Sequence, residues 1–302
     1  MTIMAENPYR VGKMTQLADG LGLILAPNPS PMTYWGTNTY LLGTTSVAVI
    51  DPGPDDDAHL AAILRHGAGR ISHIIVTHSH VDHSALAPRL AAETGASIYA
   101  YGPAHRGRSD VMSALVTNGL TYGGEGIDRG FSPDLALNDG DLITGADWSL
   151  RVVHTPGHLG NHLCLVWGDR VFTGDHVMAW ASSLVSPPDG DLTDFMASCS
   201  KLQSIPAKVY HPGHGLPVMD PAARLQWLID HRLTREAQIR DALVNGPQTP
   251  AVLTAAIYHD ILPALQPAEL RNVLAHLIDL HQRGLVSADQ TLSVDAEFSR
   301  KN

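Results

Sequence analysis

The chain has 302 residues, enough for one large domain or for a large and a small one. No apolar run approaches the length of a membrane span, and the first ten residues lack the apolar core of a signal peptide. The formal net charge is −10, and a broad basic surface is missing, which disfavours nucleic acid as a partner. The two cysteines provide no disulfide framework, so we expect a cytoplasmic protein without a membrane partner.

Short apolar runs predict three strands near the start, at residues 21–25, 38–42 and 47–50. The last two form a candidate hairpin, because the residues between them are turn-like. The third strand ends in Asp51, which is followed by Pro-Gly. Its carboxylate has two interpretations: it orients a ligand histidine, or it caps the turn. A surface helix over residues 58–66 follows.

Four potential metal ligands stand within six residues directly after an apolar, β-branched run at residues 74–76. They are His78, His80, Asp82 and His83. Imidazole nitrogen and carboxylate oxygen suit zinc and similar first-row ions, and the absence of cysteine argues against a cysteine-rich structural zinc site. The end of this predicted strand is therefore a candidate metal site.

Residues 84–94 read as a helix and 98–100 as another strand. The stretch 102–134 is Gly-rich and charged and is too long for a plain connector, so it is a candidate substrate loop. Arg106 and Arg108 in it are interpreted either as solvated surface residues or as a grip for an anionic substrate.

The pattern of strand, tight turn and ligand-type residue returns three times downstream. A strand at 150–153 leads to His158, one at 171–173 leads to Asp175, and one at 208–210 leads to His214. Prolines and glycines beside the two histidines restrict the backbone and aim the side chains. We expect these strand ends to meet at one rim of a β framework.

The composition changes near residue 221. Helices are predicted at residues 222–243, 249–258 and 266–282, followed by a hairpin of 285–287 with 291–294. Three helices and a hairpin in so short a stretch are typical of a winged helix. We therefore predict two domains, 1–221 and 222–302.

The ordering and spacing of these motifs resemble the metallo-β-lactamase superfamily over residues of about 20–220. With the opening at residues 36–41 and the helical tail, the whole chain is similar to the branch that carries a C-terminal winged helix, which includes the beta-lactamase-like protein 2 family. The resemblance implies an α/β (α+β) fold: an αββα sandwich that forms the catalytic domain, followed by a small winged-helix-like domain.

The resemblance also implies a dinuclear site. One metal would be bound by His78, His80 and His158, the second by Asp82, His83 and His214, with Asp175 bridging the two. Two zinc ions are the default, and manganese or iron would accept the same ligands. His80 argues against the di-iron oxidoreductase branch of the superfamily, where a glutamate tends to occupy this position.

Two divalent ions of this kind can present hydroxide at neutral pH, and Asp82 is the candidate catalytic residue that orients it. We expect a metal-dependent hydrolase of a small ester, thioester or lactone. The alternative is a single-strand endoribonuclease, because the resemblance is to a branch in which some members have this activity. Residues 222–302 carry 8 Lys/Arg against 9 Asp/Glu, which favours the small-molecule substrate over RNA. A third possibility is that the tail serves as a dimerisation module, giving a homodimer.

Further side chains have open roles at this point. His162 and His176 stand close enough to the motifs to support a ligand or donate a proton. His154 and His211 are interpreted as structural. Trp180 either lines the substrate pocket or packs beneath its loop.

Overall fold

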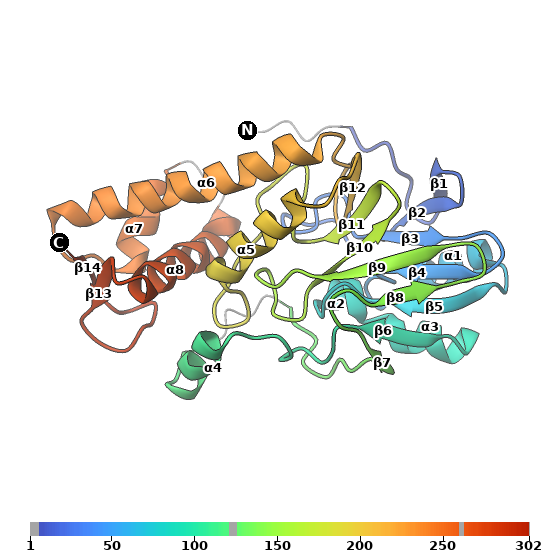
Figure 1. Ribbon diagram of the computed structural model, residues 1–302, viewed down its shortest axis with the longest axis horizontal. Helices are drawn as coiled ribbons and strands as arrows, with labels where there is room; N and C mark the ends of the chain where they lie inside the picture. Colours follow the sequence, from blue (N-terminus) through green and yellow to red (C-terminus); the bar gives the residue numbers. More distant parts are fainter. Residues whose placement is uncertain (1–5, 121–125, 260–262, 302) are drawn as a thin grey trace.

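The computed structural model describes residues 6–120, 126–259 and 263–301, and within them two β-sheets lie face to face (Figure 1). The first sheet has its strands in chain order: β1 (Met14–Ala18), β2 (Leu21–Leu25), β3 (Asn38–Leu42), β4 (Val47–Ile50), β5 (Ile71–Ile75), β6 (Ser97–Ala100) and β7 (Leu135–Ala136). Its first four strands pair antiparallel, and β4 to β7 pair in parallel.

The second sheet has the order β12 (Val209–Pro212), β11 (Arg170–Gly174), β10 (Leu163–Trp167), β9 (Ser149–His154) and β8 (Leu142–Thr144). Only β11 and β12 are parallel. The main core lies between the two sheets, where Leu23 and Tyr40 of the first sheet share one cluster with Leu165 and Phe172 of the second. The inner strands are buried on both faces, because helices cover the outer sides.

Helices complete the sandwich on both outer faces. α1 (Asp57–Gly67) and α3 (Ala87–Thr94) pack on the first sheet, and α5 (Leu192–Gln203) and α6 (Pro221–Ala242) pack on the second. Side-chain caps define two of the starts: Asp56 accepts from the backbone N–H of His59, and Asp191 accepts from that of Thr193. The predicted αββα sandwich is confirmed.

A smaller unit follows the sandwich and lies to the left in Figure 1. It contains the far end of α6, then α7 (Pro250–Ile257), α8 (Gln266–Gln282), β13 (Val286–Ala288) and β14 (Phe298–Arg300), with short 3₁₀ turns at Leu243–Asn245 and Pro263–Leu265. The hairpin predicted with residues 291–294 was wrong in its second strand. β14 pairs with β13 instead, because Phe298 is fully buried in this unit's core whereas residues 291–294 stay partly exposed.

Residues 121–125 of the stretch predicted as a substrate loop lie outside the described residues; the described part contains a helix, α4 (Asp110–Thr117). Met112 and Leu115 of α4 belong to the same buried cluster as Leu274 and Leu277 of α8. The predicted helix at 84–94 is also divided, because a short helix α2 (Val81–Ser84) precedes α3. β1 was not predicted. Among the described helices, none is both long and apolar enough to span a membrane.

Gly157 brings the β9–β10 turn against α5, at a point where only hydrogen fits. Its φ is 137°, and a Cβ placed there would lie 2.3 Å from Phe195 Cα. We expect Gly157→Ala to destabilise the protein by about 1–3 kcal/mol more than Gly140→Ala. Gly140 is the matched control, because it also has a positive φ, of 86°, but a Cβ there would meet nothing within 4 Å. Urea unfolding of both variants measures the difference, and equal losses would contradict the close approach.

Candidate metal centre

The ends of β5, β9, β11 and β12 deliver the predicted ligands to one edge of the sandwich. Beyond β5 the chain runs through His78 and His80 into α2, which carries Asp82 and His83. The structure brings the seven predicted residues into two neighbouring groups. The first contains His78, His80, His158 and Asp175, and the second contains Asp82, His83 and His214.

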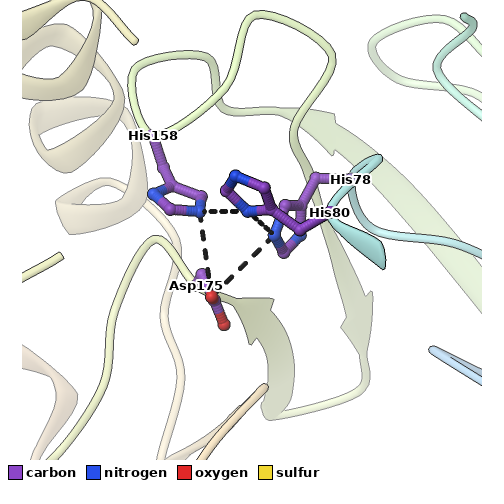
Figure 2. A group of neighbouring side chains, drawn as sticks. All are labelled: His78, His80, His158 and Asp175. Atoms are coloured by element: carbon purple, nitrogen blue, oxygen red, sulfur yellow. Dashed lines mark hydrogen bonds and ion pairs between the residues drawn. The ribbon is translucent and has the colours of Figure 1, made fainter. Parts of the chain in front are cut away.

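The first group converges three imidazole nitrogens (Figure 2). His80 Nδ1 lies 2.9 Å from His78 Nε2 and 3.0 Å from His158 Nε2. The carboxylate of Asp175 closes the group, with Oδ2 at 3.8 Å from His78 Nε2 and 3.7 Å from His158 Nε2. Nitrogen and oxygen donors gathered at these separations match the donor set of a first-row divalent ion.

The second group is equally tight. His83 Nε2 and His214 Nε2 are 3.3 Å apart, and Asp82 Oδ2 lies 3.5 Å from the first and 3.3 Å from the second. Thr37 Oγ1 donates to the same carboxylate oxygen at 3.3 Å. One hydroxyl and two imidazoles therefore contact Oδ2 of Asp82.

Asp175 stands between the two groups. Besides its contacts in the first group, its Oδ2 lies 3.4 Å from His214 Nε2, and its Oδ1 lies 3.4 Å from His83 Nε2. Oδ1 is buried and makes no hydrogen bond to any described residue. A buried carboxylate oxygen without a hydrogen-bond partner fits a position that faces a cation.

Several ring nitrogens that point away from the two groups also have partners, and these fix the imidazoles that carry them. His83 Nδ1 lies 2.9 Å from Asp51 Oδ2, and His214 Nδ1 lies 3.1 Å from the carbonyl of Gly36. His158 Nδ1 lies 2.7 Å from the carbonyl of Leu184. Such contacts set the tautomer and the ring orientation of a metal-binding histidine.

Asp51 takes the first of its two predicted roles, because its carboxylate contacts His83. It also accepts from the backbone N–H of Thr77 at 2.7 Å and from the Thr77 hydroxyl at 2.8 Å. The positive φ of 51° at Asp51 places the side chain under the loop that carries the histidines. It therefore fixes both the start of that loop and one of its imidazoles.

The two groups differ in protonation. In the first, burial, together with the nearby His158, lowers the pKa of His80 to about 3; burial likewise lowers the pKa of His78 and of His158. In the second, burial acts in the same direction, but Asp175 and Asp82 outweigh it and raise the pKa of His214 to about 10. The pKa of His83 is raised in the same way.

The pKa values of the two carboxylates are lowered, whereas those of His83 and His214 are raised. Burial alone would raise the pKa of Asp175 and Asp82, yet the imidazoles of His83 and His214 lower both. Without a metal, the second group therefore consists of two imidazolium ions and the carboxylates that face them. The first group offers neutral nitrogen lone pairs.

A cavity of about 550 Å³ lies over both groups. Its floor includes His80, Asp82, His158, Asp175 and His214. Its walls are mostly aliphatic and come from four places in the chain: Met32, Leu184, the stretch of Pro267, Ala268 and Leu270, and Val294. Arg271 of α8 also lines it. The second unit of the chain thus supplies one wall of the pocket above the candidate ligands.

Other sequence candidates lie outside this pocket. His162 packs beside His78 with its Nδ1 2.9 Å from the Thr155 hydroxyl, and His176 faces Cys199 at 3.5 Å. Both histidines are fully buried beneath the ligand loops and do not line the cavity. They are packing residues of the layer below the centre.

The two predicted arginines of the long loop have structural partners. Arg106 donates to the carbonyl of Tyr101, and Arg108 donates to Asp189 Oδ1 at 2.6 Å. Neither lines the cavity. Trp180 does not line the main cavity: its ring stacks on Tyr34 with the ring centroids 4.7 Å apart, and it lines a smaller cavity of about 130 Å³.

Several residues of the site were missed from the sequence. The carbonyls of Gly36 and Leu184 orient two imidazoles, and Ala268 and Arg271 of α8 line the pocket. A backbone carbonyl has no sequence signal, since every residue type carries one. The sequence predicted the helix at residues 266–282 but not what it would cover.

Comparison with known proteins agrees with this architecture. Residues 32–214 match the family described as the metallo-beta-lactamase superfamily, and residues 249–293 match the beta-lactamase associated winged helix domain. The first match covers more than half of the chain and contains all seven candidate ligands.

Individual relatives extend over nearly the whole chain. A Drosophila melanogaster protein named beta-lactamase-like protein 2 homolog is 31% identical over 298 residues, covering 94% of this chain and 95% of its own. An Aspergillus fumigatus protein named atrochrysone carboxyl ACP thioesterase is 29% identical over 256 residues, covering 78% and 72%.

Solved structures show the same fold. A metallo-beta-lactamase family protein from Thermus thermophilus superposes with a TM-score of 0.76 at 25% identity, over 95% of this chain and all (100%) of that one. A beta-lactamase domain protein from Burkholderia ambifaria superposes with a TM-score of 0.80 at 22% identity, over 98% and 96%. The chain therefore belongs to the metallo-beta-lactamase superfamily, as a metal-binding hydrolase with the beta-lactamase associated winged helix domain on its C-terminal side.

Proposed function

We propose that this hydrolase cleaves small thioesters or esters with two zinc ions at the paired groups. The observation that carries the proposal is the pocket: candidate ligands form its floor, and mostly aliphatic side chains form its walls. Such a pocket suits an acyl group whose carbonyl must reach the floor.

His78, His80 and His158 would hold one ion, and Asp82, His83 and His214 would hold the other, with Asp175 shared. Two divalent ions so held would supply a hydroxide nucleophile at neutral pH and polarise the substrate carbonyl. Manganese or iron would be accepted by the same nitrogen and oxygen donors.

The chain's own residues have separate tasks. Asp82 lines the pocket, and the Thr37 hydroxyl donates to its Oδ2, so the carboxylate is placed to orient the nucleophile through a hydrogen bond. Leu184 and Leu270 exclude water around the acyl group. Arg271 brings a positive charge to the pocket lining, and its guanidinium also donates to the Ser186 hydroxyl and the Pro187 carbonyl.

Thioesters are favoured over RNA for two reasons. The lining contains one arginine and no lysine among the described residues, which is poor for a polyanionic strand. The thioesterase name of the Aspergillus fumigatus relative points to the same class of bond.

The proposal is tested with a panel of acyl thioesters, simple esters and lactones, and with end-labelled single-stranded RNA in parallel. We expect the zinc-loaded protein to release acid from at least one thioester or ester and to leave RNA intact. Cleavage of RNA alone, by protein shown to hold two metals, would contradict the proposal and favour the nuclease function.

Asp82→Ala tests whether activity depends on the Asp82 carboxylate itself or only on a negative charge near the site. We expect it to lower kcat for the best ester or thioester by about 100-fold or more, because the nucleophile loses its orienting base and one metal loses a ligand. Asp128→Asn is the matched control, since its carboxylate lies on a neighbouring loop near the Ser84 hydroxyl and outside the pocket lining. Equal losses in both variants would argue against a role for Asp82.

Metal binding to the second group should release protons. Because the pKa of His214 is about 10 and that of His83 is also raised, both imidazoles are protonated at pH 7 in the metal-free protein. A metal ligand must be deprotonated, so loading this group should release about two protons, and its affinity should rise with pH from 6 to 9.

Calorimetric zinc titrations in buffers of different ionisation enthalpy measure this release. The first group, with lowered histidine pKa values, should bind with almost no proton release. We expect His214→Gln to release about one proton fewer than the wild type. A proton-neutral titration of both groups in the wild type would show that the second group is already deprotonated.

A further inference from the structure

The segment between β11 and α5 is held by residues of α6 and α8. Residues 183–190 are buried, so their backbone groups need partners within the protein. Arg232 of α6 donates to the carbonyl of Ser183, and the backbone N–H of Val185 donates to Asn272 Oδ1 of α8 at 3.0 Å. Arg232 also donates to Asn272 Oδ1, at 3.2 Å, which joins the two helices at this point.

Leu184 lies between the two clamped residues, and its carbonyl is the partner of His158. His158 Nδ1 donates to this carbonyl at 2.7 Å, which requires the proton to be on Nδ1. The lone pair is then on Nε2, the atom that faces His80 and Asp175. The position of one backbone carbonyl therefore decides where a candidate metal ligand points.

The other histidines that point an Nε2 into the centre are oriented from within the two-sheet unit. Asp51 holds His83, the Gly36 carbonyl holds His214, and the Thr77 hydroxyl lies 3.0 Å from His78 Nδ1. His158 differs from these three, because the segment that orients it is fastened by helices α6 and α8. The C-terminal part of the chain thus reaches the metal centre through His158.

Arg232 is unusual for a residue with a purely stabilising role. It is 2% exposed, and no carboxylate lies within ion-pair distance of it in the described parts of the chain. Its guanidinium lies 5.1 Å from the centroid of the Phe195 ring and bonds only neutral oxygens. An apolar side chain of similar size would avoid the cost of burying a charge. We therefore attribute the role of the guanidinium to the hydrogen bonds that it donates to Ser183 and Asn272.

We propose that Arg232, together with Asn272, is a positioning residue for the metal centre. Arg232 fixes Ser183 and Asn272 fixes Val185, and together they fix the Leu184 carbonyl that aims His158 at the first metal. The inference rests on the metal centre of the proposed function, and it adds a role for the C-terminal helices beyond lining the pocket.

Arg232→Met tests this directly, because methionine keeps much of the aliphatic length and removes both donated hydrogen bonds. The readout is cobalt(II) titration of the metal-free protein, followed by visible absorption and by competition with a chelator. His158→Ala and His214→Ala give reference spectra for protein with one or the other group disabled. We expect Arg232→Met to weaken the His158-containing group about 10- to 100-fold and to leave the other within about twofold.

Arg235→Met is the matched control. Arg235 lies on the same helix, 4.4 Å from the ring centroid of Tyr258, and donates to Gln238 at 2.7 Å, without touching the clamped segment. We expect it to bind both cobalt ions as the wild type does. Its unfolding by urea, compared with that of Arg232→Met, shows how much of any change is a general loss of stability.

A second pair of variants keeps the test independent of Arg232. Asn272→Leu removes the acceptor for Val185 and should weaken the same group, whereas Asn272→Asp keeps an acceptor oxygen and should retain its affinity. Wild-type cobalt affinity in both Arg232→Met and Asn272→Leu, or an equal loss at both groups, would overturn the positioning role alone. A wild-type protein that binds no cobalt would overturn the metal centre itself, and this inference with it.

Discussion

The candidate metal centre depends on the compensation of buried charge. Asp175 and Asp82 face imidazoles on several sides, and the mutual attraction of these groups lowers the pKa of the carboxylates and raises that of His83 and His214. Removing one member of such a set leaves its partners charged, buried and unpaired, which costs more than the lost contact itself. The ligand set is therefore a unit in which each side chain compensates the buried charge of its neighbours.

The fold supplies this unit by bringing strand ends together. The loop after β5 contributes four of the candidate ligands, and the loops after β9, β11 and β12 contribute one each. Helices on the outer faces bury the sheets, while the chain beyond α6 returns over the edge that carries the ligands. One part of the protein therefore holds the centre, and another covers it and defines the space for a substrate.

Much of the sandwich follows from local sequence. The strands β2, β3 and β4 coincide with the predicted runs, because each is a short apolar segment between turn residues. The seven candidate ligands followed from motif order and spacing, and the structure gathers all of them. β14 was placed wrongly because burial of Phe298, a long-range effect, outweighs the local pattern at residues 291–294.

The features least predictable from the sequence are those in which a backbone carbonyl orients a side chain. The Leu184 carbonyl orients His158, and Gly36 does the same for His214, although neither position differs in sequence from an ordinary loop. The clamp by Arg232 and Asn272 joins residues that are 40, 49 and 87 positions apart, so no local pattern contains it. Such contacts become visible only once the helices are placed in space.

The burial of α4 has a consequence for synthesis of the chain on the ribosome. Met112, Leu115 and Leu120 emerge early, yet the apolar surface that covers them, around Leu274 and Leu277, is translated more than 150 residues later. Until then the nascent sandwich exposes these side chains, and a chain that stops early keeps them exposed. The last helix is thus needed to finish a surface that the first half of the protein begins.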